Sequence, residues 1–438
     1  MTLFVSTRDA SRALGFSAAL EQGLSSEGGL FVPLTMPALG AADFAGAETL
    51  PEIAQRLLAP LVGDTDPLSG ALAALCAEVF AWPAPLLPLA AVGRVNVLEL
   101  FHGPTAAFKD FGARFLAASF ARLRGPASPP LTILVATSGD TGGAVAAAFF
   151  GRPGIEVAVL FPRGLVSPTQ ERQLTCWGGN VRSLAVRGTF DDCQRLVKAA
   201  FLDPELQARS ALSSANSLNL GRLAPQMAYF AAASLAVWRT HGERASFVVP
   251  SGNLGNVMGC LWARAMGLPI ADVVLAHNAN RTVPDYLQSG LWRPRASIAT
   301  LASAMDVGDP SNAERLRALY PRLEDLRAAV RAVSISDEEI RASIRSGFQS
   351  RGQIWCPHTA AAAAAYEQLP RAERRAGRWV IVATAHPAKF PEIVAPLIGR
   401  PVPVPETLAQ LFARPAQYVE IAPELGALRA ALQGNRSG

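Results

Sequence analysis

The amino-acid sequence predicts an α/β protein whose core is a mostly parallel β-sheet covered by helices on both faces. From about residue 94 onward, short apolar segments of strand length alternate with longer segments of helical pattern. These apolar segments carry few polar residues, as is typical of strands buried on both faces. Loops rich in Gly, Ser, Thr and Asn follow two of the strands and come directly before helices. Because ligands of parallel sheets bind beyond the carboxyl ends of the strands, we expect these loops to carry the chemistry.

The elements follow one another in a clear order. The first 80 residues are rich in Ala and Leu and are predicted to be mostly helical. The Pro-rich stretch 82–88 is predicted to be a linker. A helix is expected at 109–124, and the final stretch from 401 onward is expected to cap the domain and to end in a short helix. Strands are predicted at 94–100, 131–137, 155–161, 181–186, 247–250, 271–277 and 379–384.

Length and composition exclude several classes of protein. A chain of 438 residues suggests about two or three domains, and 50% hydrophobic residues indicate a sizeable core. No apolar run reaches the roughly 18 residues of a membrane span, and residues 1–9 do not resemble a signal peptide, so we expect a cytoplasmic protein. The net charge of +5 gives no reason to expect nucleic-acid binding. Five cysteines without a C-x-x-C pair, and five scattered histidines, predict neither disulfides nor a metal site.

Lysine is rare in this chain. Of the 40 basic residues only three are lysines, Lys109, Lys198 and Lys389. Arginine can replace a surface lysine but stays charged, so it cannot act as an amine. Lys109 lies where a loop meets a predicted helix, and the positive end of a helix lowers the pKa of a lysine. An amine of lowered pKa is a better nucleophile toward an aldehyde, although an exposed lysine at a helix start is the ordinary alternative.

Two loops have the composition of anion-binding sites. Residues 137–143 (TSGDTGG) offer three hydroxyls and clustered backbone N–H groups at a helix start. Residues 251–256 (SGNLGN) follow another strand, and their glycines let the backbone approach a phosphate closely. Both segments are also compatible with ordinary strand-to-helix turns. Neither segment is a G-x-G-x-x-G, no lysine follows a glycine as in a P-loop, and no G-x-S-x-G is present. One candidate amine and two anion loops indicate a phosphorylated aldehyde held as a Schiff base, which describes pyridoxal phosphate.

Five segments in a fixed order make a more specific argument. They are QGLSSEGGLFVP at 22–33, HGPTAAFKDF at 102–111, FPRGLVSP at 161–168, MDVGDPSN at 305–312 and TAHPAKF at 384–390. With these segments the chain resembles the threonine synthase family of fold type II pyridoxal-phosphate-dependent enzymes over nearly its whole length. Glu27 and Asp309 depart from the family pattern, where Asp and Asn are expected, and neither departure touches the proposed chemistry.

The resemblance implies a fold similar to the tryptophan synthase β subunit. Two mostly parallel α/β lobes would hold the cofactor between them, after an N-terminal mainly helical domain. The implied boundaries are residues 1–85 for the N-terminal domain, 86–400 for the catalytic domain and 401–438 for a C-terminal extension.

Residue roles are implied in the same way. Lys109 would form the Schiff base and then move protons. Asp140 would lie near the 3-hydroxyl of the cofactor ring, and Thr384 would offer its hydroxyl to the pyridine nitrogen. Lys389, in the closing motif, could support the residues of the site without touching the ligands, whereas Lys198 is expected to be solvated. The cofactor phosphate would be held by Gly252, Asn253, Leu254, Gly255 and Asn256.

The implied substrate site has two parts. Thr137, Ser138 and Thr141 would bind the substrate carboxylate. Asn216, Ser217 and Arg222 offer an amide, a hydroxyl and a guanidinium, which suit a phosphate on the substrate itself.

The implied activity is that of a carbon–oxygen lyase of threonine biosynthesis. O-phospho-L-homoserine and water would give L-threonine and phosphate by γ-elimination and addition of water at Cβ, in a monomer or homodimer. Three alternatives stay open. They are a phospho-lyase that releases an α-keto acid, an amino-acid dehydratase or cysteine synthase of the same fold, and a non-catalytic metabolite-binding protein.

Overall fold

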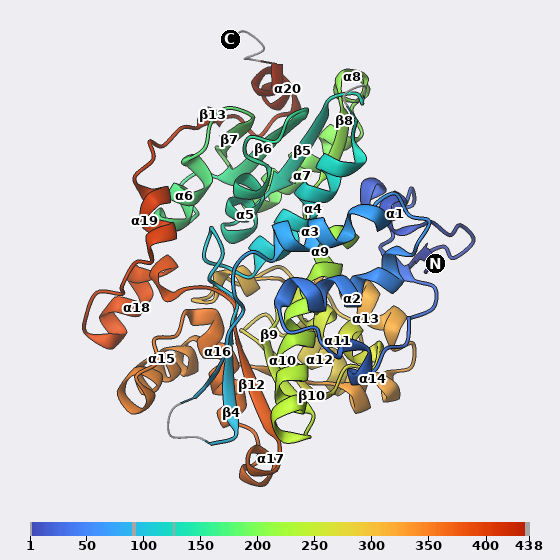
Figure 1. The fold of residues 1–438 in the computed structure, drawn as a ribbon. Helices are drawn as coiled ribbons and strands as arrows, with labels where there is room; N and C mark the ends of the chain where they lie inside the picture. The colour runs from blue at the N-terminus through green and yellow to red at the C-terminus, as the bar shows by residue number, and fades with distance from the viewer. Residues whose placement is uncertain (1, 90–92, 126–127, 434–438) are drawn as a thin grey trace.

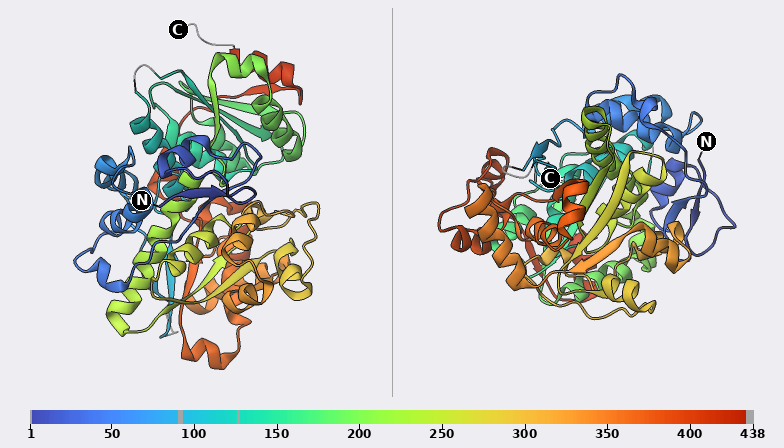
Figure 2. Two further views of the ribbon diagram at one scale, coloured as in Figure 1. Left: turned by 90° about the vertical axis from the view of Figure 1, so that its right-hand side faces the viewer. Right: turned by 90° about the horizontal axis from the view of Figure 1, so that it is seen from below.

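Two β-sheets form the centres of two lobes that lie one above the other (Figure 1). The computed structural model describes residues 2–89, 93–125 and 128–433 of the chain. A third part, made of the first 80 residues, lies beside the junction between the lobes, as the left view of Figure 2 shows. In the part of the chain so described, no helix is both long and apolar enough to cross a membrane.

The lower lobe contains a six-stranded sheet. Its strand order is β11-β10-β9-β12-β4-β3, and every pair is parallel except β3 with β4. The strands are β3 (Leu86–Pro88), β4 (Val95–Glu99), β9 (Ala245–Pro250), β10 (Ile270–His277), β11 (Arg331–Ser334) and β12 (Arg378–Ala383). Helices that pack on it include α10 (Met227–His241), α11 (Gly255–Ala265) and α16 (Pro357–Glu367).

The upper lobe contains a five-stranded sheet of order β13-β7-β6-β5-β8, parallel throughout. Alternate residues of β5 enter different cores: Ile133 and Val135 join the main hydrophobic cluster, whereas Leu134 joins a smaller one under α7 (Phe190–Phe201) and α20 (Leu425–Gln433). Both faces are therefore buried, which explains the continuous apolar runs. The strands are β5 (Leu131–Ala136), β6 (Ile155–Pro162), β7 (Val181–Val186), β8 (Ala211–Ser214) and β13 (Val419–Ile421).

The N-terminal part combines a small antiparallel pair with helices. Strand β1 (Phe4–Ser6) pairs with β2 (Phe31–Pro33), and the helices are α1 (Phe16–Gln22), α2 (Leu50–Val62) and α3 (Leu72–Val79). Helix α2 begins at a capping box in which Thr49 and Glu52 satisfy each other's backbone N–H groups. Helix α2 packs on α10 of the lower lobe, and α1 packs on α4 (Lys109–Leu123). The N-terminal part thus contacts the helix that begins with Lys109 and a helix of the lower lobe.

The predicted parallel α/β architecture is confirmed, and each predicted strand is present with ends shifted by no more than two residues. The predicted linker at 82–88 is wrong in one respect, because it contains the edge strand β3. The final segment runs from α18 (Pro391–Ile398) through α19 (Glu406–Phe412) back to the upper lobe (Figure 1). There it adds β13 beside β7 and ends in the expected short helix, α20.

Candidate active site

The candidate lysine stands at a turn that joins the two lobes. Lys109 is the first residue of α4, and the preceding turn contains Ala106 at a left-handed φ of 53°. The turn is closed by Asp110, whose carboxylate accepts hydrogen bonds from the backbone N–H and hydroxyl of Thr105 at 2.8 and 2.6 Å. Phe108 donates its N–H to the carbonyl of Thr384 at 2.9 Å, directly after β12. This contact brings Lys109 close to Thr384, although the two residues are far apart in the sequence.

The environment of Lys109 lowers the pKa of its amine. Burial is the largest cause, and the positive charges of Lys389 and Arg222 act in the same direction, whereas Asp140 opposes them. The Lys109 Nζ lies 3.6 Å from Oδ2 of Asp140. The direction agrees with the expectation from the helix start, but burial rather than the helix end is the main cause.

The loop after β5 is shaped by Thr137. Its Oγ1 accepts hydrogen bonds from the N–H groups of Gly139 and Gly142 at 3.0 and 2.9 Å. Gly139 has a φ of 149°, and a Cβ there would lie 2.5 Å from Gln170, so only glycine fits. Ser138 is exposed and Thr141 is half-buried. The Thr137 hydroxyl is thus committed to the turn, while the other two hydroxyls of the predicted substrate set stand outside it.

The loop after β9 is tied to the neighbouring loops by Asn253. The Asn253 Nδ2 donates to Ser217 Oγ at 2.7 Å, and its Oδ1 accepts from the N–H of Ser311 at 2.7 Å. Its carbonyl accepts from Asn312 Nδ2 at 2.9 Å. The side chain of Asn253 is therefore occupied in holding the loop. It also brings Ser217, predicted to bind substrate, against the predicted cofactor-phosphate loop.

Asn256 offers the loop an unused donor. Its Oδ1 accepts a hydrogen bond from the Tyr229 hydroxyl at 2.7 Å, but its buried Nδ2 has no partner. Leu254 just before it adopts a left-handed φ of 62°, and α11 begins at Gly255. A buried, unpartnered amide donor at the start of a helix fits a phosphate oxygen. The residues present therefore suit the phosphate of the cofactor that the sequence predicts.

Replacing Gly252 with alanine is expected to weaken cofactor binding by about 5- to 150-fold, because forced packing costs about 1–3 kcal/mol. An added Cβ would lie 2.6 Å from the Met305 Cα, a backbone atom that cannot swing aside. Absorbance titration of cofactor-free protein with pyridoxal phosphate measures the effect. Gly70→Ala is the control, because an added Cβ there meets nothing within 4 Å. Equal cofactor affinity in both variants would contradict the tight placement of this loop.

Arg222 is a buried cation that has no carboxylate partner in the part of the chain that the structure describes. It is 2% exposed, and burial lowers its pKa to about 10, with only a longer-range opposing effect from Asp110. Its Nη1 donates to the carbonyl of Ala215, whereas its Nε has no partner. Within the described ranges no Asp or Glu lies within ion-pair distance of it. A buried guanidinium in this state is suited to an anionic ligand.

Helix α9 (Leu220–Leu223) carries Arg222 and is held against both the N-terminal part and α4. Asn219 caps this helix by accepting from the Gly221 N–H at 2.8 Å, and its Nδ2 donates to the Leu20 carbonyl at 2.9 Å. A Cβ on Gly112 of α4 would lie 2.4 Å from the Arg222 carbonyl. The close approach places Arg222 beside the helix that begins with Lys109.

Several residues of the site were not singled out for it from sequence. Arg315, fully buried, donates to the carbonyls of Phe31 and Leu218 at 3.0 and 2.6 Å and to Asn312 Oδ1 at 2.7 Å. It thereby joins the N-terminal part to the segments that carry Leu218 and Asn312. Arg315 lies four residues after Ser311, but this position in the sequence does not predict its contacts, because Phe31 and Leu218 belong to distant segments.

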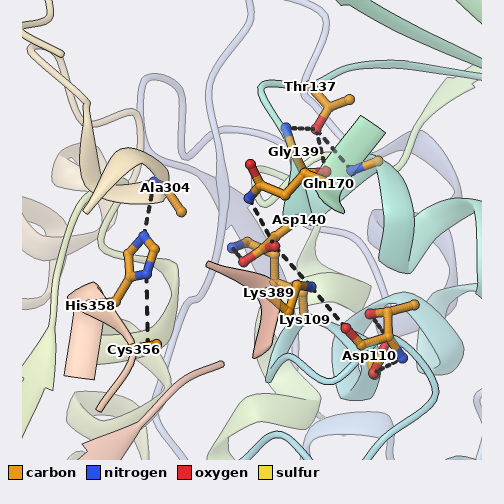
Figure 3. A network of polar contacts seen from close by, with 12 residues as sticks. Lys109, Asp110, Thr137, Gly139, Asp140, Gln170, Ala304, Cys356, His358 and Lys389 are labelled. Carbon is orange, nitrogen blue, oxygen red and sulfur yellow. Dashed lines mark hydrogen bonds and ion pairs between the residues drawn. The ribbon is translucent and has the colours of Figure 1, made fainter. Parts of the chain in front are cut away.

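Lys389 and His358 complete the polar network of Figure 3. The Lys389 Nζ lies 2.9 Å from Asp140 Oδ1, and Gln170 Nε2 donates to the same oxygen at 3.2 Å. His358 accepts a hydrogen bond from the Ala304 N–H at 3.0 Å, and burial lowers its pKa to about 4. His358 is therefore neutral and holds the segment that carries Ala304, whereas Lys198 is exposed, as expected.

Comparisons with known proteins agree along the whole chain. A pyridoxal-phosphate-dependent enzyme model matches residues 78–385, and models of the threonine synthase N terminus and C-terminal region match 3–80 and 359–432. Threonine synthase of Haemophilus influenzae is 42% identical over 388 residues, which is 88% of each chain.

Solved structures give the same result. Threonine synthase from Escherichia coli superposes with a TM-score of 0.89 and 36% identity, over 98% of this chain and 99% of that one. The pyridoxal-phosphate-bound threonine synthase from Brucella melitensis superposes with a TM-score of 0.91 and 33% identity, over 100% of both chains. The chain therefore belongs to the threonine synthase family of fold type II pyridoxal-phosphate-dependent enzymes, and pyridoxal phosphate is its cofactor.

Proposed function

We propose that this protein converts O-phospho-L-homoserine and water to L-threonine and phosphate. The observation that carries the substrate assignment is the buried Arg222, which among the described residues has no partner for its Nε and no carboxylate beside it. The cofactor phosphate would have its own loop at 252–256, so the buried cation Arg222 calls for a second anion. A substrate with its own phosphate supplies that anion, whereas a dehydratase substrate does not.

The cofactor would be held by groups from both lobes. The unpartnered Asn256 Nδ2 and the backbone N–H groups of 252–256 would bind its phosphate. Asp140 would face the 3-hydroxyl and Thr384 the pyridine nitrogen, on either side of Lys109. When bound, pyridoxal phosphate supplies an electron sink for the electron pair left when a proton is removed from the amino-acid carbon.

Lys109 would perform the proton transfers. Its Nζ would hold the aldehyde of the cofactor, and it would act as a free amine once substrate has taken its place. Because burial lowers the pKa of this amine, its neutral form is favoured relative to that of an exposed lysine, and this form can take the α-proton of the substrate. The same nitrogen can return a proton to Cα at the end of the reaction.

The remaining loops would orient the substrate. Arg222, with Asn216 and Ser217, would hold the γ-phosphate before and after the C–O bond breaks. Ser138 and Thr141 would bind the carboxylate, and Thr137 would keep their loop in shape through its bonds to Gly139 and Gly142. We propose that the part formed by residues 1–85 supports these loops through Arg315 and Asn219, beside the catalytic domain 86–400 and the extension 401–438.

An assay of the purified holoenzyme with O-phospho-L-homoserine, in which phosphate, threonine and α-ketobutyrate are measured together, tests the proposal. Equal amounts of phosphate and threonine are expected. Phosphate with α-ketobutyrate instead would identify a phospho-lyase on the same scaffold. A cofactor-loaded protein that releases no phosphate would contradict the assignment of Arg222 to the substrate.

A further inference from the structure

Lys389 is a fully buried lysine with a fixed set of partners. It ends the short helix η5 (Pro387–Lys389) and none of its side chain is exposed. Its Nζ donates to the Thr105 carbonyl at 2.8 Å and lies 2.9 Å from Asp140 Oδ1. Thr105 belongs to the turn that precedes Lys109, so this one ammonium group connects three segments of the site (Figure 3). Burying an ammonium group costs desolvation free energy. An apolar side chain could fill the same space without this cost, so packing alone does not explain a lysine here.

The two lysines share one carboxylate unequally. Lys389 and Gln170 both contact Oδ1 of Asp140, at 2.9 and 3.2 Å. Lys109 faces the other oxygen, Oδ2, at 3.6 Å. Lys389 is therefore the closer counter-ion, and Lys109 is left at the margin of hydrogen-bond distance.

The other charged and titratable groups around Asp140 do not replace Lys389. His358 on α16 is neutral, because burial lowers its pKa to about 4 and its Nε2 accepts the Ala304 N–H. Burial also raises the pKa of the Cys356 thiol, which is therefore uncharged. On α4, Asp110 is bound to Thr105, and the Arg222 guanidinium bonds the Ala215 carbonyl. Lys389 and Lys109 are the cations placed to neutralise Asp140.

We propose that Lys389 is a positioning residue that acts through Asp140: it neutralises this carboxylate so that the Lys109 amine is not held there as its ion-pair partner. Lys389 keeps Asp140 ionised and facing the cofactor site, and it repels a proton on Lys109. This inference rests on the proposed role of Lys109 as amine and base. It explains why that amine is available in its neutral form.

Loss of the Lys389 charge should raise the pKa of the Lys109 amine. Asp140 would then have Lys109 as its main counter-ion, and an opposite charge at about 4–6 Å shifts a pKa by about 1–3 on the pH scale. A rise of about 1 lowers the neutral amine fraction near neutral pH about tenfold. Lys389→Met and Lys389→Gln remove the charge, and Gln keeps a hydrogen-bond donor. Lys389→Arg keeps the charge.

The scarcity of lysine makes the pKa directly measurable. The full-length chain, freed of cofactor and labelled with 13Cε-lysine, gives three side-chain signals, one for each of its three lysines. Lys198→Arg assigns the exposed lysine and serves as the control with an unchanged Lys109 titration. We expect the pKa of Lys109 to be about 1 higher in both uncharged variants than in the unaltered chain. In Lys389→Arg it should stay close to the original value.

A second readout follows the return of the cofactor. The rate at which pyridoxal phosphate binds covalently, followed by absorbance, depends on the neutral fraction of Lys109. It should fall about tenfold at neutral pH in Lys389→Met and recover as the pH is raised. Neither readout uses O-phospho-L-homoserine, so a failure of the proposed activity and a failure of this inference are separately visible.

Three results would overturn the inference. One is a folded uncharged variant whose Lys109 titrates as in the unaltered chain. Another is Lys389→Arg raising the Lys109 pKa as much as Lys389→Met does. The third is failure of both uncharged variants to fold, judged by circular dichroism, because Lys109 can still neutralise Asp140 and a positioning role does not require Lys389 for folding.

Discussion

Lys109→Ala is expected to lower turnover of O-phospho-L-homoserine by about 10⁴-fold, since a positioned proton-transfer group alone contributes about 10²–10⁴ and its covalent hold on the cofactor is lost as well. Lys109→Arg should lose as much, because its guanidinium keeps a charge near Asp140 but cannot act as an amine. Steady-state phosphate and threonine release measures both variants, and the visible absorbance of the bound cofactor should change in parallel.

The chain offers a matched control for this prediction. Lys198 lies exposed on α7, so Lys198→Ala removes a lysine without touching the site. Its turnover and cofactor absorbance should equal those of the unaltered enzyme. Full activity in Lys109→Ala would refute the assigned role of Lys109, and with it the amine chemistry proposed for this site.

Arg222→Met is expected to raise the KM for O-phospho-L-homoserine by roughly 10- to 150-fold. Hydrogen bonds to a charged group contribute about 1.5–3 kcal/mol, and about 1.4 kcal/mol corresponds to a tenfold change. The affinity for pyridoxal phosphate should change much less, because the cofactor loop begins at another strand and has its own donor in Asn256. The KM of Arg222→Lys should lie between those of the unaltered enzyme and Arg222→Met, since lysine keeps the charge but not the planar guanidinium group.

Two comparisons separate substrate binding from general damage. Arg345→Ala removes an exposed arginine from α15 (Asp337–Arg351) and should leave KM unchanged. Thermal unfolding of Arg222→Met shows whether loss of the bond to the Ala215 carbonyl has destabilised the fold. If cofactor affinity falls by the same factor as KM rises, Arg222 belongs to the cofactor site instead.

The accuracy of the strand predictions followed burial. Strands β5, β6 and β7 were found from sequence because nearly every residue in them is buried, which produces continuous apolar runs. Strands β1, β2, β3, β8, β11 and β13 were missed. Each is only three or four residues long, and the last four are also partly exposed at sheet edges, so no long buried run marks them. Pairing with an existing sheet, not local sequence, makes these segments strands.

For the candidate site, local sequence was informative where a function needs a particular residue type. An amine requires lysine, a close backbone approach requires glycine, and both stand out in a chain with three lysines and two glycine loops before helices. These features alone predicted Lys109, both loops and the kind of cofactor. The family resemblance then supplied the reaction, as an expectation from five segments in order.

Tertiary structure alone decided which charges meet and which hydrogen bonds are already used. Lys389 reaches Asp140, and Arg315 reaches Phe31, across large separations in sequence that no local pattern reports. The sequence suggests the hydroxyl of Thr137 and the amide of Asn253 as ligand groups. In the structure both already form hydrogen bonds that hold their loops in place. The sequence by itself determined the residue types that can do the chemistry. Folding determined their charge and availability, because burial and Coulomb interactions depend on distances through space.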